Sequence, residues 1–180
     1  MDHDQLIVIH VSAGNPFRRW PMEAFAEVAA ALASEAADRR VIITSGPSDR
    51  GAATAVIGAA RARLGPEAAP RILESGEFSL SELRALVDRA ALYIGGDSGP
   101  LHVAATSGVP IVALYGPTLP ARSAPWRPDT FEAHAVEVIG LPCRPCHQRT
   151  CEPGDFRCLT AIAPAQVIAG ARAVLRRGGR

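Results

Sequence analysis

The sequence contains no lysine, and all 19 of its basic side chains are arginines. Within this chain, the absence of lysine excludes a lysine Schiff base and the Walker A phosphate clamp. Arginine is a permanent cation whose planar fork suits phosphates and carboxylates. Compositional bias explains most of these arginines, so only those beside other polar motifs are considered as candidate ligand-binding residues.

Long apolar runs are also missing. No run approaches the roughly 18 residues of a membrane span, and Met1–Gln5 is too polar for a secretory signal. The net charge of +1 points to neither nucleic acid nor an acidic membrane surface as a partner. Since 48% of the 180 residues are hydrophobic, the chain can bury a sizeable core. We expect a soluble cytoplasmic domain that binds no nucleic acid.

Short apolar runs alternate with helical patterns along the chain. The runs that predict strands are 6–11, 41–45, 71–73, 92–95 and 109–115. The helical patterns are 21–36, 48–64 with Ser48 as a candidate N-cap, 79–90 with a capping-box spacing, 102–107 and 163–177. This alternation predicts one α/β domain over residues 1–180, a Rossmann-like doubly wound parallel sheet. Residues 116–160 break the pattern, and we expect a long ordered Pro/Cys-rich loop there, before the C-terminal helix.

Three polar turns follow the first, second and fourth predicted strands. Their sequences are "HVSAGNPFRRWP", "TSGPSD" and "GGDSGPLH". Ligands of open α/β sheets bind outside the carboxyl ends of the strands. Glycine and small polar residues let backbone N–H groups approach a ligand closely. The sequence therefore predicts a ligand site at this edge of the sheet.

The third turn offers the clearest set of side chains. Ser98 and Gly99 place a hydroxyl and free N–H groups at the start of a helix, an arrangement that binds phosphate. His102 could add a hydrogen bond to the same anion. Asp97 would repel a phosphate, so it is expected to accept from a hydroxyl or to orient His102 or an arginine. The alternative is that Asp97 and Ser98 only cap the helix.

The first turn places Ser12 and Gly14 in a small-residue loop followed by Arg18. An arginine beside such a loop suits a diphosphate. The alternative is a solvated face with Trp20 in the core. His10 precedes this loop, and it either faces the ligand edge or is a hydrogen-bonded core histidine.

The stretch "GDSGPLHVAATSGVPIVALYGPTLPARSAPW" resembles the signature region of the glycosyltransferase family 9 heptosyltransferases. The "RRWP" element that follows Ser12 and the "CRPCHQRTCEPGDFRCL" segment resemble the same family. Those enzymes transfer heptose from ADP-heptose to the inner core of lipopolysaccharide. They have the GT-B architecture of two Rossmann-like domains, and this chain resembles the C-terminal half, which binds the nucleotide sugar.

The resemblance also implies roles for individual residues. Substrate-binding positions are expected at Ser12, Gly14, Arg18, Asp97, Ser98, Gly99, His102, Gly116 and Thr118. Arg18 stands where many heptosyltransferases carry lysine, and it is the expected catalytic cation for the leaving diphosphate. The implied reaction is an inverting displacement without a metal or other cofactor.

The rest of such an enzyme would lie outside this chain. A missing N-terminal domain would hold the glycolipid acceptor and supply the base, and the full enzyme would associate peripherally with the inner membrane. Two alternatives remain open: a nucleotide-sugar epimerase of the same architecture, and a non-catalytic nucleotide-binding module.

Four cysteines form the pattern C-x2-C-x4-C-x6-C within the Pro/Cys-rich loop. They are Cys143, Cys146, Cys151 and Cys158. A structural zinc site with His147 as a substitute ligand, one or more disulfides, and free thiols all remain open. None of these states makes the cysteines catalytic.

Overall fold

A computed structural model of the chain describes residues 5–74 and 77–178. Six parallel strands form one sheet in the order β3-β2-β1-β4-β5-β6. The strands are β1 (Gln5–His10), β2 (Arg39–Thr44), β3 (Ile72–Leu73), β4 (Leu92–Gly96), β5 (Ile111–Tyr115) and β6 (Ala133–Glu137). This strand order is that of a Rossmann-type sheet, so the predicted fold class is confirmed.

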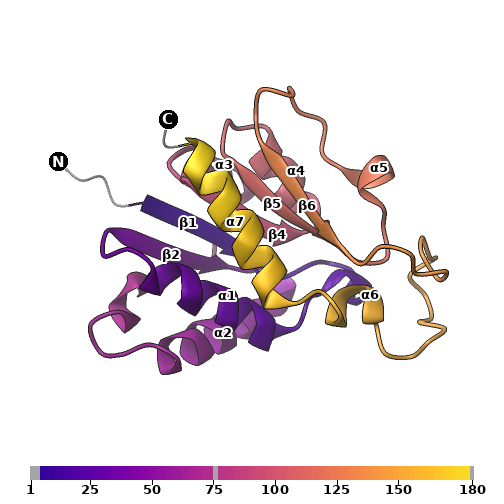
Figure 1. Ribbon diagram of the computed structural model, residues 1–180, viewed down its shortest axis with the longest axis horizontal. Coiled ribbons are helices and arrows are strands. Elements are labelled where there is room, and N and C mark those ends of the chain that lie inside the picture. The colour runs from indigo at the N-terminus through magenta and orange to yellow at the C-terminus, as the bar shows by residue number, and fades with distance from the viewer. Residues whose placement is uncertain (1–4, 75–76, 179–180) are drawn as a thin grey trace.

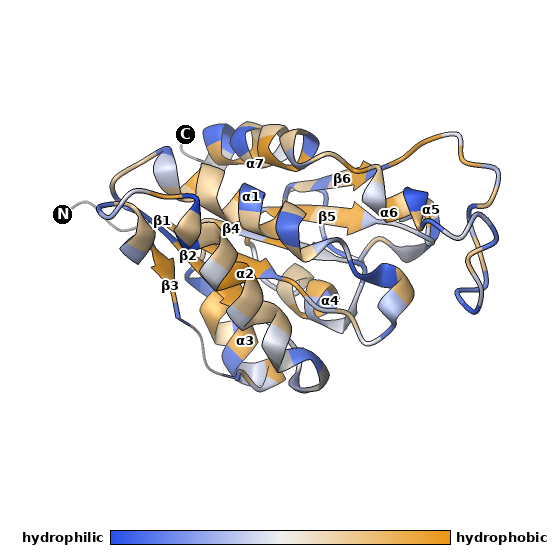
Figure 2. Cartoon of the chain, turned by 90° about the horizontal axis from the view of Figure 1, so that it is seen from below, coloured by the Kyte–Doolittle hydropathy of each residue, from blue (hydrophilic) through white to orange (hydrophobic). Residues whose placement is uncertain are grey.

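Helices cover both faces of the sheet (Figures 1 and 2). One face carries α1 (Met22–Ser34), α2 (Arg50–Ala62) and α7 (Pro164–Gly178), and the other carries α3 (Leu80–Asp88) and α4 (Gly99–Ala105). Short helices α5 (Pro120–Ser123) and α6 (Arg157–Thr160) lie beyond β5, and 3-10 turns lie at Pro16–Arg18, Pro47–Asp49 and Ala69–Arg71.

Alternate residues of each strand feed the two halves of the core. In β1, Ile7 and Ile9 pack with α1, while Val8 between them packs on the side of α3 and α4. All three side chains are fully buried. Trp20 also lies in the core, as the alternative interpretation of the first turn has it, and its indole N–H donates to the Ile162 carbonyl at 3.2 Å. A sheet covered on both faces leaves the strand ends as the places where polar groups can gather.

Two helix starts differ from the prediction. The residue before α2 is Asp49 rather than Ser48, because a 3-10 turn over Pro47–Asp49 takes up the start of that pattern. Helix α4 begins at Gly99, three residues before the expected start at His102, since Pro100 fits the first turn of a helix. In contrast, the capping box at Ser79 and Glu82 is confirmed at α3.

The prediction of one long loop over about 116–160 was wrong in part. It contains α5, α6 and the edge strand β6, which pairs with β5 from Ala133 to Glu137. Three of the five β6 residues are exposed and only Val136 is buried, so this edge strand lacks the apolar run that marks the inner strands. The C-terminal helix is confirmed as α7. Within residues 5–74 and 77–178, no helix has the length and apolar character needed to span a membrane.

Candidate functional site

A cavity of about 260 Å³ opens at the carboxyl ends of β1 and β2. Ser12 and Gly14 line it from the first turn, and Ser98 and Gly99 line it from the start of α4. Phe78, Leu80 and Leu83 supply an apolar wall. We call this space the strand-end cavity. It combines hydroxyl and backbone donors with an apolar surface, as a site for an anion joined to an apolar group requires.

The Ser12 hydroxyl has two partners within the protein. Its Oγ accepts from the Gly46 N–H at 2.7 Å and lies 3.1 Å from His10 Nε2. The other ring nitrogen, His10 Nδ1, lies 2.9 Å from Thr44 Oγ1. Burial lowers the pKa of His10 to about 4, so the ring is neutral near pH 7. His10 is thus a hydrogen-bonded core residue that also lines the strand-end cavity.

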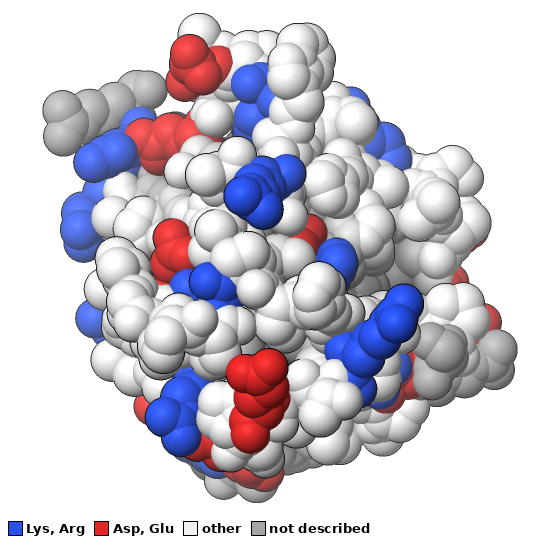
Figure 3. Space-filling model, turned by 90° about the vertical axis from the view of Figure 1, so that its right-hand side faces the viewer, with Lys and Arg blue, Asp and Glu red and all other residues white. Residues whose placement is uncertain are grey.

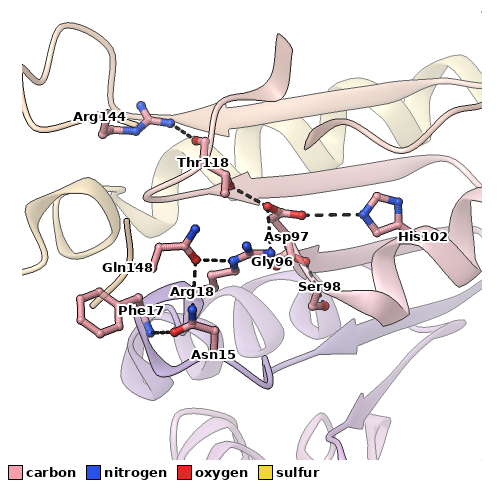
Figure 4. A network of polar contacts seen from close by, with 10 residues as sticks. All are labelled: Asn15, Phe17, Arg18, Gly96, Asp97, Ser98, His102, Thr118, Arg144 and Gln148. Atoms are coloured by element: carbon pink, nitrogen blue, oxygen red, sulfur yellow. Dashed lines mark hydrogen bonds and ion pairs between the residues drawn. The ribbon is translucent and has the colours of Figure 1, made fainter. Parts of the chain in front are cut away.

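Asp97 is the centre of a second polar group, shown in Figure 4. Its carboxylate accepts from Thr118 Oγ1 at 2.7 Å and lies 3.3 Å from Arg18 Nη1. His102 Nε2 lies 3.8 Å from the other carboxylate oxygen. We call Asp97, Arg18, Thr118 and His102 the Asp97 cluster. The aspartate thus accepts from a hydroxyl and pairs with an arginine, two of the contacts that the sequence predicts for it.

The capping alternative for this turn is wrong. Ser98 Oγ donates back to the Gly96 carbonyl at 3.2 Å and makes no capping bond to α4. The Asp97 carboxylate turns toward Arg18 and Thr118 instead. Gly96 has its own requirement, because an added Cβ would lie 3.2 Å from the Arg18 carbonyl oxygen. The first and third turns therefore approach each other closely.

Sequence reasoning missed Gln148. Its Oε1 accepts from Arg18 Nε at 2.6 Å and from Asn15 Nδ2 at 3.2 Å. The residue has a φ of +56°, a left-handed conformation that is unfavourable for a side chain other than glycine. Such local strain is typical of residues held by a specific set of contacts. The only signal in the sequence was its place inside the cysteine motif, which does not indicate a contact 130 positions away.

Arg144 is a second missed residue, and it fixes the loop that carries Gln148. Its side chain is 4% exposed and forms an ion pair with Glu137 at 2.9 Å. It also donates to the carbonyl oxygens of Val138 and Thr118, the latter at 2.7 Å. Arg144 therefore joins the end of β6 to the segment that presents Thr118 to Asp97.

Gly116, two positions before Thr118, has a packing requirement of its own. A Cβ at Gly116 would lie 2.5 Å from Leu159 Cγ, so the glycine allows α6 to pack against the end of β5. Burial raises the pKa of the neighbouring Tyr115, and the Asp97 and Glu137 carboxylates raise it further. Packing thus explains why residue 116 is a glycine.

The four cysteines line a larger cavity of about 760 Å³ beside the Asp97 cluster. Their thiols are unpaired, and burial raises the pKa of Cys158. Among residues 5–74 and 77–178, no group of three or more His, Cys, Asp or Glu side chains is arranged to hold a metal ion. Figure 3 shows arginines and acidic residues interspersed on the face seen there, with no continuous basic surface.

Comparison with known proteins gives a consistent answer. The model of glycosyltransferase family 9 (heptosyltransferase) matches residues 2–156. Lipopolysaccharide heptosyltransferase 3 of Escherichia coli is 32% identical over 163 residues, which cover 91% of this chain and 45% of that protein. The chain therefore spans less than half the length of that relative.

Solved structures agree with this match. The E. coli ADP-heptose lps heptosyltransferase II is 25% identical with a TM-score of 0.77, over 100% of this chain and 49% of that one. A family 9 glycosyltransferase from Veillonella parvula is 29% identical with a TM-score of 0.72, over 97% of this chain and 46% of that one. With its fold, its strand-end polar turns and its sequence all in agreement, this chain belongs to glycosyltransferase family 9.

Proposed function

We propose that the chain is the donor-binding domain of an inverting glycosyltransferase that transfers heptose from ADP-heptose to a lipopolysaccharide core acceptor. The observation that carries this proposal is the strand-end cavity, in which Ser12, Gly14, Ser98 and Gly99 meet beside the Asp97 cluster. The similarity to an E. coli enzyme named for ADP-heptose supports the choice of donor.

Different parts of the donor are expected to contact the polar wall and the apolar wall of the cavity. Its diphosphate would accept hydrogen bonds from the Ser12 hydroxyl and from N–H groups of the Ser98–Gly99 turn. Its base and ribose would lie toward Phe78, Leu80 and Leu83, where an apolar ring loses little by leaving water. The cavity is open at the strand ends, so the β-phosphate would lie toward Arg18 and the heptose would extend beyond it.

The reaction would be a single displacement at the anomeric carbon. An acceptor hydroxyl oxygen attacks that carbon while the bond to the diphosphate oxygen breaks on the opposite side. The electron pair of the broken bond stays with ADP, and the acceptor proton passes to a base. Arg18, already oriented by Asp97 and Gln148, would stabilise the negative charge that grows on the diphosphate.

Asp97 is not the base in this scheme. Its carboxylate accepts from Thr118 and pairs with Arg18, so it positions other groups. The base and the glycolipid acceptor site would belong to an N-terminal domain, consistent with relatives about twice the length of this chain. We further propose that the full enzyme works in the cytoplasm, in peripheral contact with the inner membrane. The family match does not favour the epimerase alternative.

Calorimetric titration of the chain with ADP, UDP and GDP tests this proposal. ADP should bind most tightly, and Arg18→Ala should weaken ADP binding roughly tenfold or more. Arg89→Ala, which removes an exposed arginine at the end of α3, is the matched control and should leave binding unchanged. A preference for UDP or GDP would discard the heptose donor. Failure of a folded chain to bind any nucleotide would contradict the assignment of the strand-end cavity.

A further inference from the structure

We propose that His10 is a positioning residue whose Nε2–H tautomer directs the Ser12 hydroxyl proton toward an anion in the strand-end cavity. The inference rests on the proposed function in one respect: the anion is taken to be the donor's diphosphate. The contacts that carry it are those of three buried side chains, His10, Ser12 and Thr44, and of the Gly46 N–H.

The starting point is the bonding capacity of the Ser12 hydroxyl. A serine oxygen can accept two hydrogen bonds and donate one. The Gly46 N–H, at 2.7 Å, is fixed as a donor and takes one accepting position. The 3.1 Å contact with His10 Nε2 can run in either direction. The state of the imidazole therefore decides whether Ser12 keeps its proton for a ligand.

The two neutral tautomers of His10 give opposite results. If Nδ1 carries the proton, Nε2 is an acceptor and takes the only proton of Ser12, which leaves the hydroxyl unable to donate to an anion. If Nε2 carries the proton, it donates to Ser12 Oγ and fills the second accepting position. The Ser12 proton is then free to donate into the cavity that this residue lines.

Thr44 distinguishes between these tautomers. Its Oγ1 lies 2.9 Å from His10 Nδ1 and 3.5 Å from the Ile9 carbonyl oxygen. With the proton on Nδ1, the threonine would accept from the ring, and its own proton would have only the long contact to Ile9. With the proton on Nε2, Thr44 donates to Nδ1 at a normal hydrogen-bond distance. The second arrangement gives the buried Thr44 hydroxyl a good acceptor and leaves the one unpartnered hydroxyl proton on Ser12, which lines the cavity.

Burial keeps the imidazole ring of His10 neutral. The pKa of His10 is lowered to about 4, so the imidazole carries a single ring proton near pH 7. A neutral ring must choose between its two nitrogens, and its environment sets that choice. The His10 ring and Thr44 thus form a relay from the second strand to the first turn, and the relay ends at the Ser12 hydroxyl.

The first test needs no ligand. Long-range proton–nitrogen correlation spectra of the labelled chain separate protonated from unprotonated ring nitrogens. The signals of His10 are identified among those of the five histidines because they disappear in the His10→Gln variant. We expect a protonated Nε2 and an unprotonated Nδ1 at pH 7. A protonated Nδ1 would overturn the inference, whatever the chain binds.

The second test is calorimetric titration with pyrophosphate and with ADP. Asparagine at position 10 reaches only the Nδ1 position, whereas glutamine places an N–H near Nε2. His10→Asn and Ser12→Ala should each weaken pyrophosphate binding roughly five- to tenfold. The double variant should be no weaker than Ser12→Ala alone, because His10 acts through Ser12. His10→Gln should stay within about twofold of the original chain.

The outcomes separate this inference from the proposed function. Unchanged affinity in a folded His10→Asn, or additive losses in the double variant, would overturn the role of His10. Equal binding of ADP and pyrophosphate, with the expected effects of the variants, would count against the nucleotide-sugar donor and leave the His10 inference standing. If the chain binds neither probe, both proposals fail.

Discussion

Arg18 and Asp97, 79 positions apart in the sequence, meet with Nη1 of the guanidinium 3.3 Å from the carboxylate. The carboxylate is buried while the arginine side chain is 31% exposed. One partner is thus fixed in the protein and the other faces solvent. Asp97 therefore holds in place a cation that a ligand can reach.

Asp97→Asn should lower the free energy of unfolding by about 1–2 kcal/mol, because it removes the buried negative charge that pairs with Arg18 and accepts from Thr118. It should also weaken ADP binding, since Arg18 loses its orienting partner. Urea denaturation and calorimetry measure the two effects. Asp129→Asn, at an exposed turn, should change neither quantity. An unchanged free energy of unfolding in Asp97→Asn would mean that the ion pair with Arg18 does not stabilise the fold.

Gln148→Ala should weaken ADP binding about fivefold, because Arg18 Nε loses the amide oxygen that holds it. Gln148→Gly loses the same contacts but suits the positive φ at this position. The two variants should therefore bind ADP equally, although their thermal stabilities differ. Calorimetry measures the affinity of each variant for ADP. Undiminished affinity in both variants would show that Gln148 does not position Arg18.

Gly116→Ala should destabilise the chain by about 1–3 kcal/mol, because its Cβ would overlap Leu159. The surviving folded fraction should bind ADP with its original affinity, since the glycine serves packing. Gly58→Ala in α2 is the control, because a Cβ there meets nothing within 4 Å. Chemical denaturation with parallel titration measures both properties. A selective loss of affinity at residue 116 would instead restore the substrate-binding role that the sequence implies.

The sequence predicted the interior of the fold better than its edge. The inner strands are apolar on both faces, and the capping box at Ser79 is a local pattern, so both could be found from the sequence alone. Strand β6 is mostly exposed, so its formation depends on pairing with β5.

The candidate site shows the same division. Ser12, Asp97 and Thr118 lie in small polar turns, whose position after strands could be predicted. Gln148 and Arg144 act through contacts that only the folded chain creates. Their side chains meet partners from distant segments, and no local periodicity or spacing encodes such a meeting.

Stability should depend on pH through His10. Its pKa is lowered to about 4 in the folded chain, whereas an unfolded histidine titrates near 6.5. Between these values the unfolded state binds more protons, so stability falls as the pH drops from about 6.5 to about 4. Urea denaturation measures the free energy of unfolding at pH 7 and at pH 4.5. The loss of stability between these two pH values should be smaller in His10→Gln than in the original chain. An equal loss of stability in the two proteins would mean that His10 is not buried as a neutral ring.

The cysteines should differ in reactivity. Cys158 is buried with a raised pKa, whereas Cys143, Cys146 and Cys151 are partly exposed. Alkylation proceeds through the thiolate, so Cys158 should react most slowly with iodoacetamide at pH 8. Peptide mapping by mass spectrometry gives the order, with the urea-unfolded chain as control. Equal rates in the native chain would contradict the burial of Cys158.

The hydrogen bond between Asn15 and Gln148 closes a loop of 133 positions in a chain of 180 residues. Closing such a long loop costs chain entropy, and contacts of high sequence separation slow folding. We therefore expect Arg18 to take up its working orientation among the last events of folding. During synthesis, the chain would hold a formed sheet before it held a competent site. A donor that binds this arrangement would then select chains whose folding is complete.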